Sequence, residues 1–446
     1  MKFGGTSVGS AERIRAVAEI VRERAARRPA VVVSAFAHVT DTLIRGARLA
    51  EARDGSHEGV TSELRERHAS VVRDLVLDAA ARERLLLQIG AVIDELHTLY
   101  SAVHSLGELT PRSLDAISAI GERLSFEIVA AALVERGVKA KPVDARSVIV
   151  TDDSFGHAMP LLDATAARAS EHVRPLLEAG CVPILPGFVA ATASGITTTL
   201  GRGGSDWSAS ILGSALLAEE IQIWTDVDGM MTVDPRLVPS ARVIPEVSFA
   251  EAAELAYFGA KVLHPATIRP AVEKGIPVVV LNTMNPTAPG TRITESSHGS
   301  EGEPRAIAAK QGITVVMISQ PRMLMAFGFL ARVFEVFNRH RTSVDLIATS
   351  EVSVSLTIDD VERLDVIRRD LAELGEVVVL ERMAIVSVVG RGFTRRSGLA
   401  GRIFGVLGNV NIVMISFGAS DVNVSFVVAE ADAERTVRAL HRAFFE

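Results

Sequence analysis

The sequence predicts an α/β protein in which a largely parallel sheet lies between helices and is followed by two smaller α/β units. Three observations support this fold class. Short apolar strand patterns alternate with helical patterns up to residue 284, a stretch rich in Pro, Gly, Ser and Thr covers 285–304, and the remainder contains an internal repeat. The chain has 446 residues, and a length of this order suggests about three domains.

The alternating part consists of short apolar runs and longer segments with apolar residues at helical spacing. The predicted strands are residues 30–34, 148–150, 182–185, 221–224 and 278–281. The predicted helices are residues 13–28, 121–134, 161–178, 207–218 and 249–258, while residues 59–104 are mostly helical and form an insertion beside the sheet. Strands that alternate with helices favour parallel pairing, because each parallel crossover needs a long connection.

The last part of the chain repeats itself. Residues 328–356 shifted by 70 positions superpose on residues 398–426 without a gap, and eight pairs are identical, beginning with Gly328/Gly398. Each copy reads strand, turn, helix, two strands and helix, which predicts two βαββαβ units, although chance similarity of small α/β segments is an alternative. The expected organisation is a main domain at 1–284, a linker at 285–304, and paired units at 305–446, the first at about 320–382 and the second at about 383–446.

Composition excludes several classes of protein. With 47 basic and 54 acidic residues the net charge is −7, so no overall positive field is available for nucleic acid or an anionic membrane surface. The single cysteine, Cys181, cannot form an internal disulfide or a cysteine-based zinc site, and buried packing is its ordinary role. No apolar run is long enough for a transmembrane helix. We expect a cytoplasmic protein that binds neither nucleic acid nor membrane.

Two glycine-rich segments have the chemistry of anion sites. Residues 2–7 read Lys-Phe-Gly-Gly-Thr-Ser, and glycine lets backbone N–H groups approach a phosphate closely. Residues 197–206 place three glycines, Arg202 and Asp206 before a predicted helix, so N–H groups, a helix dipole and a guanidinium face one region. A plain Gly-Gly turn and an aspartate that only caps the helix are the alternatives. The second segment matches neither a P-loop nor a dinucleotide fingerprint.

Two further segments place polar residues after regular elements. Residues 224–229 read Trp-Thr-Asp-Val-Asp-Gly at the end of a predicted strand, where α/β sheets bind ligands. Residues 258–265 contain Lys261 after a helical pattern. An acidic surface turn and a lysine at a helix C-terminus are the alternatives. The motifs of zinc metalloproteases, serine hydrolases and protein kinases do not occur, which argues against those classes.

Together, in their order along the chain, these segments resemble the aspartokinases of the amino-acid kinase family. The resemblance rests on residues 2–8, 121–122, 198–206, 224–226 and 258–265, spans essentially the whole chain, and is most specific at 197–206. The repeat resembles the paired ACT domains of that family. The implied fold is an amino-acid kinase domain followed by two ferredoxin-like ACT domains, with a strand near Ala306–Ala309, within 305–312, that completes the second. The helical insertion and residues 343–354 look closest to the monofunctional, lysine-sensitive branch.

The resemblance implies ATP-dependent phosphorylation of the L-aspartate side chain to 4-phospho-L-aspartate, the first step towards lysine, threonine and methionine. A carboxylate nucleophile is ionised at pH 7, so the enzyme mainly positions two anions and neutralises charge. The implied catalytic residues are Lys2, Arg202 and Asp206. The implied aspartate-binding residues are Thr40, Glu122, Arg202, Gly203, Gly204 and Ser205. The implied ATP-binding residues are Lys2, Phe3, Gly4, Gly5, Thr225, Asp226, Met231, Arg236, Lys261 and Val262, with Mg²⁺ held by phosphate oxygens rather than by a protein cage.

The resemblance also implies feedback regulation by an amino acid, with lysine as the expected effector, and a homodimer or homotetramer assembled through the ACT domains. The implied effector-binding residues are Met323, Ala326, Phe329, Leu330, Val344, Asp345, Ser350 and Glu351. From the residues alone, two other functions stay open. One is a different amino-acid kinase, such as one acting on glutamate, and the other is an ACT-based amino-acid sensor with a decayed kinase domain.

Four positions depart from the pattern of the family. Only Met1 precedes the first lysine, where the family has several apolar residues, so we expect that the native start lies upstream or that the first strand is short. Met231 replaces a tyrosine near the nucleotide, Ala326 replaces a serine at the effector site, and Ala190 replaces a glycine. None of these changes removes a charged catalytic group.

Overall fold

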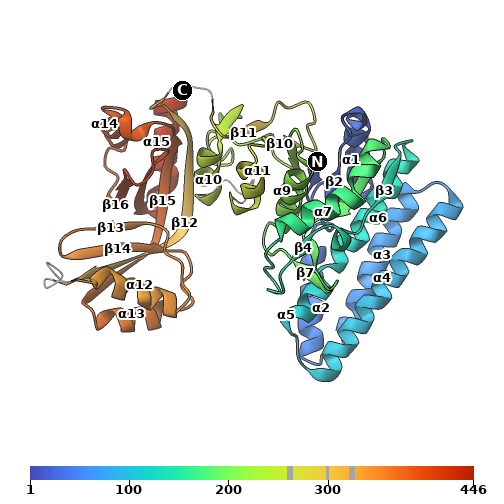
Figure 1. Cartoon of the computed structure of the whole chain (residues 1–446). Coiled ribbons are helices and arrows are strands. Elements are labelled where there is room, and N and C mark those ends of the chain that lie inside the picture. The colour runs from blue at the N-terminus through green and yellow to red at the C-terminus, as the bar shows by residue number, and fades with distance from the viewer. Residues whose placement is uncertain (259–264, 298–300, 321–326) are drawn as a thin grey trace. The chain divides into compact units, whose positions relative to one another are not determined.

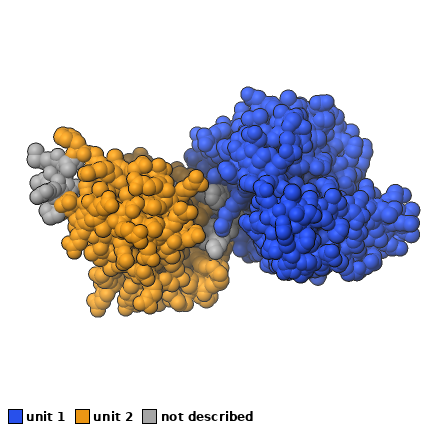
Figure 2. All heavy atoms as spheres, turned by 90° about the horizontal axis from the view of Figure 1, so that it is seen from below, with its two compact units in different colours: residues 1–230, 245–249, 262–297 blue, residues 231–244, 250–261, 298–446 orange. Residues whose placement is uncertain are grey.

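The computed structural model describes residues 1–258, 265–297, 301–320 and 327–446. They divide into two compact units, which are coloured separately in Figure 2. The first unit comprises residues 1–230, 245–249 and 262–297, and the second comprises residues 231–244, 250–261 and 298–446. Two segments that precede residue 284 therefore belong to the second unit, and no sequence pattern indicated this.

The first unit is built on an eight-stranded sheet in the order β3-β5-β2-β1-β8-β10-β11-β9 (Figure 1). Its strands are β1 (Lys2–Phe3), β2 (Val31–Val33), β3 (Ala140–Pro142), β5 (Val182–Pro186), β8 (Ile221–Thr225), β9 (Glu246–Ser248), β10 (Val278–Asn282) and β11 (Thr291–Thr294). Neighbouring strands pair in parallel except β10 with β11. The central strands are almost continuous runs of Val and Ile, as expected for a parallel sheet covered on both faces. The prediction of a largely parallel sheet is confirmed.

A smaller sheet and a set of helices complete this unit. The small sheet consists of β4 (Val150–Thr151), β6 (Val189–Thr192) and β7 (Thr197–Thr199). The helices are α1 (Ala11–Glu23), α2 (Val39–Glu51), α3 (His57–Leu75), α4 (Ala79–Leu106), α5 (Pro111–Ser118), α6 (Ile120–Glu135), α7 (Leu162–His172), α8 (Arg174–Glu178), α9 (Gly204–Leu216) and α11 (Arg269–Glu273). Short 3₁₀ turns lie at Ala25–Arg27, Ala145–Ser147 and Pro265–Ile268.

Several predicted elements are divided or shifted. The helical insertion is two helices, because Asp78 accepts a hydrogen bond from the backbone N–H of Ala81 and so caps a new helix. The predicted helix at 161–178 divides before Pro175, which has no N–H to continue the helical ladder. The strand predicted at 148–150 lies at Val150–Thr151, because the Asp144 side chain holds the preceding residues in a 3₁₀ turn. The stretch 285–304 is not only a connector, because it contains β11.

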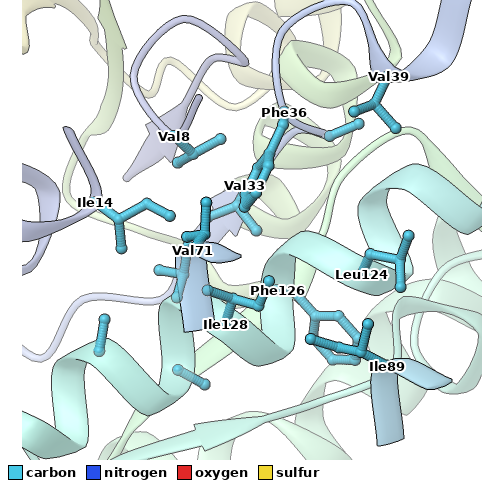
Figure 3. Packing of buried hydrophobic residues seen from close by; sticks show 14 of the residues in the cluster. Val8, Ile14, Val33, Phe36, Val39, Val71, Ile89, Leu124, Phe126 and Ile128 are labelled. Carbon is cyan, nitrogen blue, oxygen red and sulfur yellow. The ribbon is translucent and has the colours of Figure 1, made fainter. Parts of the chain in front are cut away.

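The helical insertion shares the core of the first unit. Figure 3 shows Val33, Phe36, Leu124 of α6, Val71 of α3 and Ile89 of α4 in one cluster of buried side chains. These side chains are all buried. Because burial of apolar surface is the main stabilising term, α3 and α4 are integral to the fold rather than appended to it.

The second unit contains a six-stranded antiparallel sheet in the order β13-β14-β12-β15-β17-β16. Its strands are β12 (Pro304–Ser319), β13 (Ile347–Thr349), β14 (Ser353–Ile358), β15 (Glu376–Gly390), β16 (Ile412–Phe417) and β17 (Asn423–Ala429). Its helices are α12 (Phe329–Arg339), α13 (Leu364–Ala372), α14 (Leu399–Gly405), α15 (Glu430–Phe445) and nearly all of α10 (Phe249–Tyr257), and Phe393–Arg395 form a 3₁₀ turn.

The two long strands β12 and β15 join the two repeats. Residues 304–310 of β12 pair with 385–390 of β15, which pairs in turn with β17 of the second repeat. Residues 313–319 pair with 376–383 and with β14 of the first repeat. The strand predicted near Ala306–Ala309 is therefore present beside the second repeat. The first repeat opens at residue 313, earlier than the predicted boundary near 320.

Candidate active site

The site begins at the carboxyl end of β1, between β2 and β8. The Gly4 N–H donates to the Trp224 carbonyl, 3.2 Å away, and the Gly5 carbonyl accepts from the Ala37 N–H at the same distance. A Cβ at Gly5 would lie 2.8 Å from the Ala35 carbonyl oxygen, so a side chain at this position would displace one of the two loops. The Phe3 ring is fully buried and stacks on Trp224. Only the backbone of Phe3 is therefore placed to contribute to a ligand site.

The side chain of Lys2 meets the helix that follows the glycine-rich segment. Its Nζ lies 2.6 Å from Oδ1 of Asp206, and the two side chains are only 11% and 15% exposed. Asp206 lies in the first turn of α9, where a carboxylate is stabilised by the helix dipole. The ion pair thus links the first strand to the start of α9.

The glycine-rich loop between β7 and α9 needs its glycines for backbone geometry. Gly201 and Gly203 both have φ of +73°, a conformation that side chains disfavour. Gly203 occupies the N-cap position of α9, so the helix begins three residues earlier than the predicted Trp207. The Gly204 N–H donates to the Gly201 carbonyl at 3.0 Å. The other N–H groups of that first turn and the helix dipole make this end of α9 suitable for an anion.

These segments surround a cavity of about 360 Å³. Its wall contains eight residues predicted from the sequence, namely Lys2, Gly5, Thr40, Glu122, Gly203, Gly204, Ser205 and Asp206. A second cavity of similar volume is lined by residues such as Ala30 and Ile221, at the amino ends of the same strands. The predicted residues therefore gather at the carboxyl end of the sheet, where α/β proteins bind ligands.

Glu122 is the acidic group buried in the cavity wall. It lies in the first turn of α6, and its residue is only 4% exposed. Its Oε2 has no hydrogen-bond partner within the part of the chain that the structure describes. Burial raises the pKa of Glu122 to about 8, although a hydrogen bond from the Ala35 backbone opposes the shift. A carboxylate in this position needs a cation, because an unpaired buried charge is unfavourable.

Arg202 differs from its neighbours in the loop. Its side chain is exposed and does not belong to the cavity wall. Among the described residues no carboxylate forms an ion pair with its guanidinium. The guanidinium of Arg202 is therefore available to bind an anion beside the glycine-rich loop.

The predicted nucleotide-binding residues are spread over both units. Thr225 and Asp226 lie at the carboxyl end of β8, in the first unit. Met231 and Arg236 lie in the second unit, and the Arg236 guanidinium is paired with Asp234 at 2.6 Å. Lys261 and Val262 lie outside the described residues.

The predicted effector residues lie in the first repeat, apart from Met323 and Ala326, which are outside the described residues. Phe329 is buried in the core of that repeat and Val344 packs against it. Leu330, Ser350 and Glu351 are exposed. Asp345 is already engaged, because its Oδ2 lies 3.1 Å from Nζ of Lys310 and its Oδ1 accepts a hydrogen bond from Tyr257.

Sequence reasoning missed half of the cavity wall. The missed residues are Ser34, Ala35, Phe36, Ala37, His38, Asp41, Phe188 and Gly201. Most follow β2, and Phe188 follows β5. The sequence contained a signal for these residues. Residues 30–34 and 182–185 were predicted as parallel strands, and the residues that follow the carboxyl ends of such strands lie at the same edge of the sheet. The Ala190 departure is accommodated in β6, where the methyl group is buried in a small apolar cluster.

Comparison with known proteins decides the family. The model of the amino acid kinase family matches residues 1–282, and an ACT domain model matches residues 386–444. The chain is 41% identical to aspartokinase 1, chloroplastic, of Arabidopsis thaliana over 463 residues, covering 100% of this chain and 80% of that protein. This chain belongs to the aspartokinases. An aspartokinase transfers a phosphoryl group from ATP to L-aspartate, so the predicted family, fold class and enzyme activity are confirmed.

An aspartokinase of Escherichia coli is similar to this chain along its whole length. Lysine-sensitive aspartokinase 3 of Escherichia coli (strain K12) is 39% identical over 460 residues, covering 100% of this chain and 98% of that protein. The structure of E. coli aspartokinase III with aspartate and ADP superposes with a TM-score of 0.84 at 38% identity, covering 100% and 99% of the two chains. The structure with lysine and aspartate gives 0.85 at the same identity and coverage. Among the described helices of this aspartokinase, none is long and apolar enough to cross a membrane.

Proposed function

We propose that the cavity at the carboxyl end of the sheet binds L-aspartate and brings its side-chain carboxylate to the γ-phosphate of ATP. The observation that carries this proposal is the buried Glu122 carboxylate, which has an oxygen without a partner among the described residues and shares a wall with the Lys2–Asp206 pair. A carboxylate nucleophile is already ionised at neutral pH, so no side chain has to remove a proton. One carboxylate oxygen forms the new bond to phosphorus while the bond from phosphorus to the oxygen of the ADP leaving group breaks.

Each group of the amino acid then has a complementary partner. Glu122 accepts the ammonium, and ionisation of its carboxyl becomes favourable once that cation is bound. Arg202 holds the α-carboxylate, for which a guanidinium offers two parallel N–H donors. Thr40 and Ser205 donate or accept further hydrogen bonds from the cavity wall. Two charged contacts of opposite sign distinguish an amino acid from a simple dicarboxylate.

Lys2 supplies positive charge where the two anions meet. Like charges at short range repel strongly, so a cation beside the transferring phosphoryl group lowers the barrier. Asp206 keeps the Lys2 ammonium in place before substrate arrives, at an Nζ–Oδ1 distance of 2.6 Å. Preorganisation of this kind avoids the free energy of ordering a flexible lysine during the reaction.

The hydrogen-bond donors around the cavity are suitable for the phosphates of ATP. We propose that Mg²⁺ enters the site bound to these phosphates. Gly5 lets the loop after β1 pass close to the Ala35 backbone at the cavity wall, and the N-terminus of α9 and Lys2 present donors and positive charge. Among the described residues no set of three His, Cys, Asp or Glu side chains is arranged to hold a metal. Mg²⁺ would neutralise phosphate charge through phosphate oxygens and water. Thr225 and Asp226 of β8, with Met231, Arg236, Lys261 and Val262, are the proposed nucleotide contacts.

We further propose that lysine regulates the enzyme through the first ACT repeat. The relative in E. coli is named lysine-sensitive, and a solved neighbour contains lysine. In this chain the chemistry is suitable, because Asp345 is a carboxylate already shown to accept an ammonium group, that of Lys310. Assembly as a homodimer or homotetramer through the ACT repeats and a cytoplasmic location remain predictions from the family and the composition.

The test is formation of aspartyl hydroxamate from ATP, Mg²⁺ and L-aspartate in the presence of hydroxylamine. We expect activity with L-aspartate, none with L-glutamate, and inhibition by lysine but not by threonine. Activity that is insensitive to lysine would support the proposed aspartate kinase reaction and reject lysine as the effector. No activity, with lysine binding retained in calorimetry, would reject the proposed roles of the cavity residues.

A further inference from the structure

Asp115 is a buried carboxylate that none of the motifs included. It lies in α5, and its residue is only 2% exposed. Its Oδ2 accepts hydrogen bonds from the backbone N–H groups of Gly156 and Thr199, both at 3.0 Å. Its Oδ1 accepts from the Thr199 hydroxyl at 2.7 Å. No Lys or Arg among the described residues forms an ion pair with it, so its acceptors are used for neutral donors of the backbone and one hydroxyl.

Two of these three donors belong to Thr199, which lies at the start of the loop that carries Arg202. Thr199 is the last residue of β7, and Arg202 follows three residues later. The intervening loop includes Gly201, and glycine gives a chain more conformational freedom than any other residue. A loop of this composition holds Arg202 in one place only if both of its ends are fixed.

The far end of the loop is fixed independently of Asp115. The Trp207 N–H donates to the Gly203 carbonyl at 3.1 Å, which starts α9. The Lys2–Asp206 ion pair then ties the first turn of that helix to β1. Asp115 supplies the matching anchor at the near end.

Asp115 also holds the surface against which the loop packs. The 154–157 turn is tied to it through the Gly156 N–H, and a Cβ at Gly201 would lie 3.0 Å from the Gly156 carbonyl oxygen. One carboxylate therefore binds two partners, the turn that packs against Gly201 and Thr199, two residues before Gly201. A movement of either partner would shift the loop and the guanidinium on it.

We propose that Asp115 is a positioning residue for substrate binding, which sets the place of the Arg202 guanidinium and so the affinity for the α-carboxylate of aspartate. This inference rests on the proposed role of Arg202. A residue that only stabilises the fold would not act through one particular side chain, whereas Asp115 acts through Arg202.

The test compares steady-state kinetics of the full-length enzyme for Asp115→Ala, Asp115→Asn, Arg202→Ala and the double variant Asp115→Ala/Arg202→Ala. We expect Asp115→Ala to raise the KM for aspartate by about tenfold or more and the KM for ATP by less than about twofold. Asp115→Asn should recover most of the loss, because its amide oxygen can accept from both backbone N–H groups while its NH₂ donates to the Thr199 hydroxyl. The double variant should have the same aspartate KM as Arg202→Ala alone, since effects through a shared partner are not additive.

A matched control removes a buried hydrogen bond between α7 and another strand of the same small sheet, β4. Thr165 is fully buried and its hydroxyl accepts from the Val150 N–H at 3.0 Å, so Thr165→Val should lower the melting temperature without changing either KM. If Asp115→Ala does not fold, Thr199→Val, which removes one of the three donors, takes its place in the same cycle.

The outcomes separate the two proposals. Additive effects in the double variant, or an equal rise in aspartate KM for Thr165→Val, would overturn the positioning role. An unchanged aspartate KM for Arg202→Ala would instead reject the proposed carboxylate clamp, whatever Asp115 does. Non-additivity with rescue by asparagine supports the inference.

Discussion

Lys2 and Asp206 form a largely buried ion pair in which Nζ and Oδ1 are 2.6 Å apart, although the two residues belong to different motifs that are far apart in the sequence. Lys2 belongs to β1 and Asp206 to the first turn of α9. The pair joins the two glycine-rich segments that are separate in the sequence. It also explains why a lysine at the edge of the cavity has a defined position without a ligand.

Removal of either partner should mainly lower turnover. We expect Lys2→Ala and Asp206→Ala to lower kcat by on the order of 10²-fold or more, since transition-state charge stabilisation is lost. The control is Asp94→Ala, which removes the acidic partner of Arg65 in an exposed ion pair and should leave kcat unchanged. Initial rates at saturating ATP and aspartate measure the effect. Near-normal kcat in both variants would contradict the proposed roles.

Aspartate binding should depend on pH through Glu122. Burial raises the pKa of this carboxyl to about 8, so at pH 7 the empty site is mainly protonated and must lose that proton to accept an ammonium. Affinity should therefore rise between pH 6 and 8, by at most about tenfold per pH unit. Glu122→Gln should raise the aspartate KM and abolish this dependence.

The Glu122 carboxyl should also make the stability of the ligand-free protein depend on pH, but in the opposite direction, so that stability falls as pH rises. Its folded-state pKa is higher than its ordinary value of 4.5, so the folded protein holds the extra proton and stability falls as pH rises from about 4.5 to 8. Without ligand, Glu122→Gln should melt at a higher temperature than the unchanged protein at pH 8.5. The control is Glu127→Gln on the same helix, where burial also raises the pKa but the side chain is not part of the cavity wall. An aspartate KM that varies equally with pH in both variants would refute the assignment to Glu122.

The helical insertion should act on substrate binding through Arg67. Its guanidinium donates to the Ala37 carbonyl at 2.8 Å, and the next residue, His68, stacks on Phe36, so α3 supports the loop that forms one cavity wall. Loss of one charged hydrogen bond should raise the aspartate KM of Arg67→Ala on the order of threefold to tenfold. Arg73→Ala on the same helix, which removes an exposed pair with Glu66, should have no effect. Equal kinetics in the two variants would show that the insertion only stabilises the fold.

Lysine sensitivity should increase when Lys310 is removed. The Lys310 ammonium lies 3.1 Å from Oδ2 of Asp345, whose side chain is only 2% exposed, and 2.8 Å from Oδ2 of Asp359. An effector ammonium that binds Asp345 has to compete with it. In Lys310→Ala the buried carboxylate lacks this cation, so lysine should inhibit at roughly tenfold lower concentration. Inhibition curves measure the shift, with the exposed Lys274→Ala as control, and a higher inhibitory concentration would contradict the competition.

The sequence was sufficient for the α/β class, the repeat and most of the charged residues of the cavity. Periodicity reports which faces are buried, and glycine-rich segments before a helix restrict the backbone locally, so both are readable without a structure. The family pattern added the order of the motifs. Element boundaries were less accurate, because caps such as Asp78 and Asp144 depend on which donor a side chain meets.

Only the tertiary structure decided what meets across the chain. It brought Lys2 to Asp206, showed that one oxygen of Glu122 has no partner among the described residues, and placed Asp115 beside Thr199, 84 residues away. It also assigned residues 231–244, which carry Met231 and Arg236 of the predicted nucleotide site, to the same compact unit as the ACT repeats. Such contacts depend on parallel strands meeting at one edge and on long-range hydrogen bonds, and neither leaves a periodic signal in the sequence.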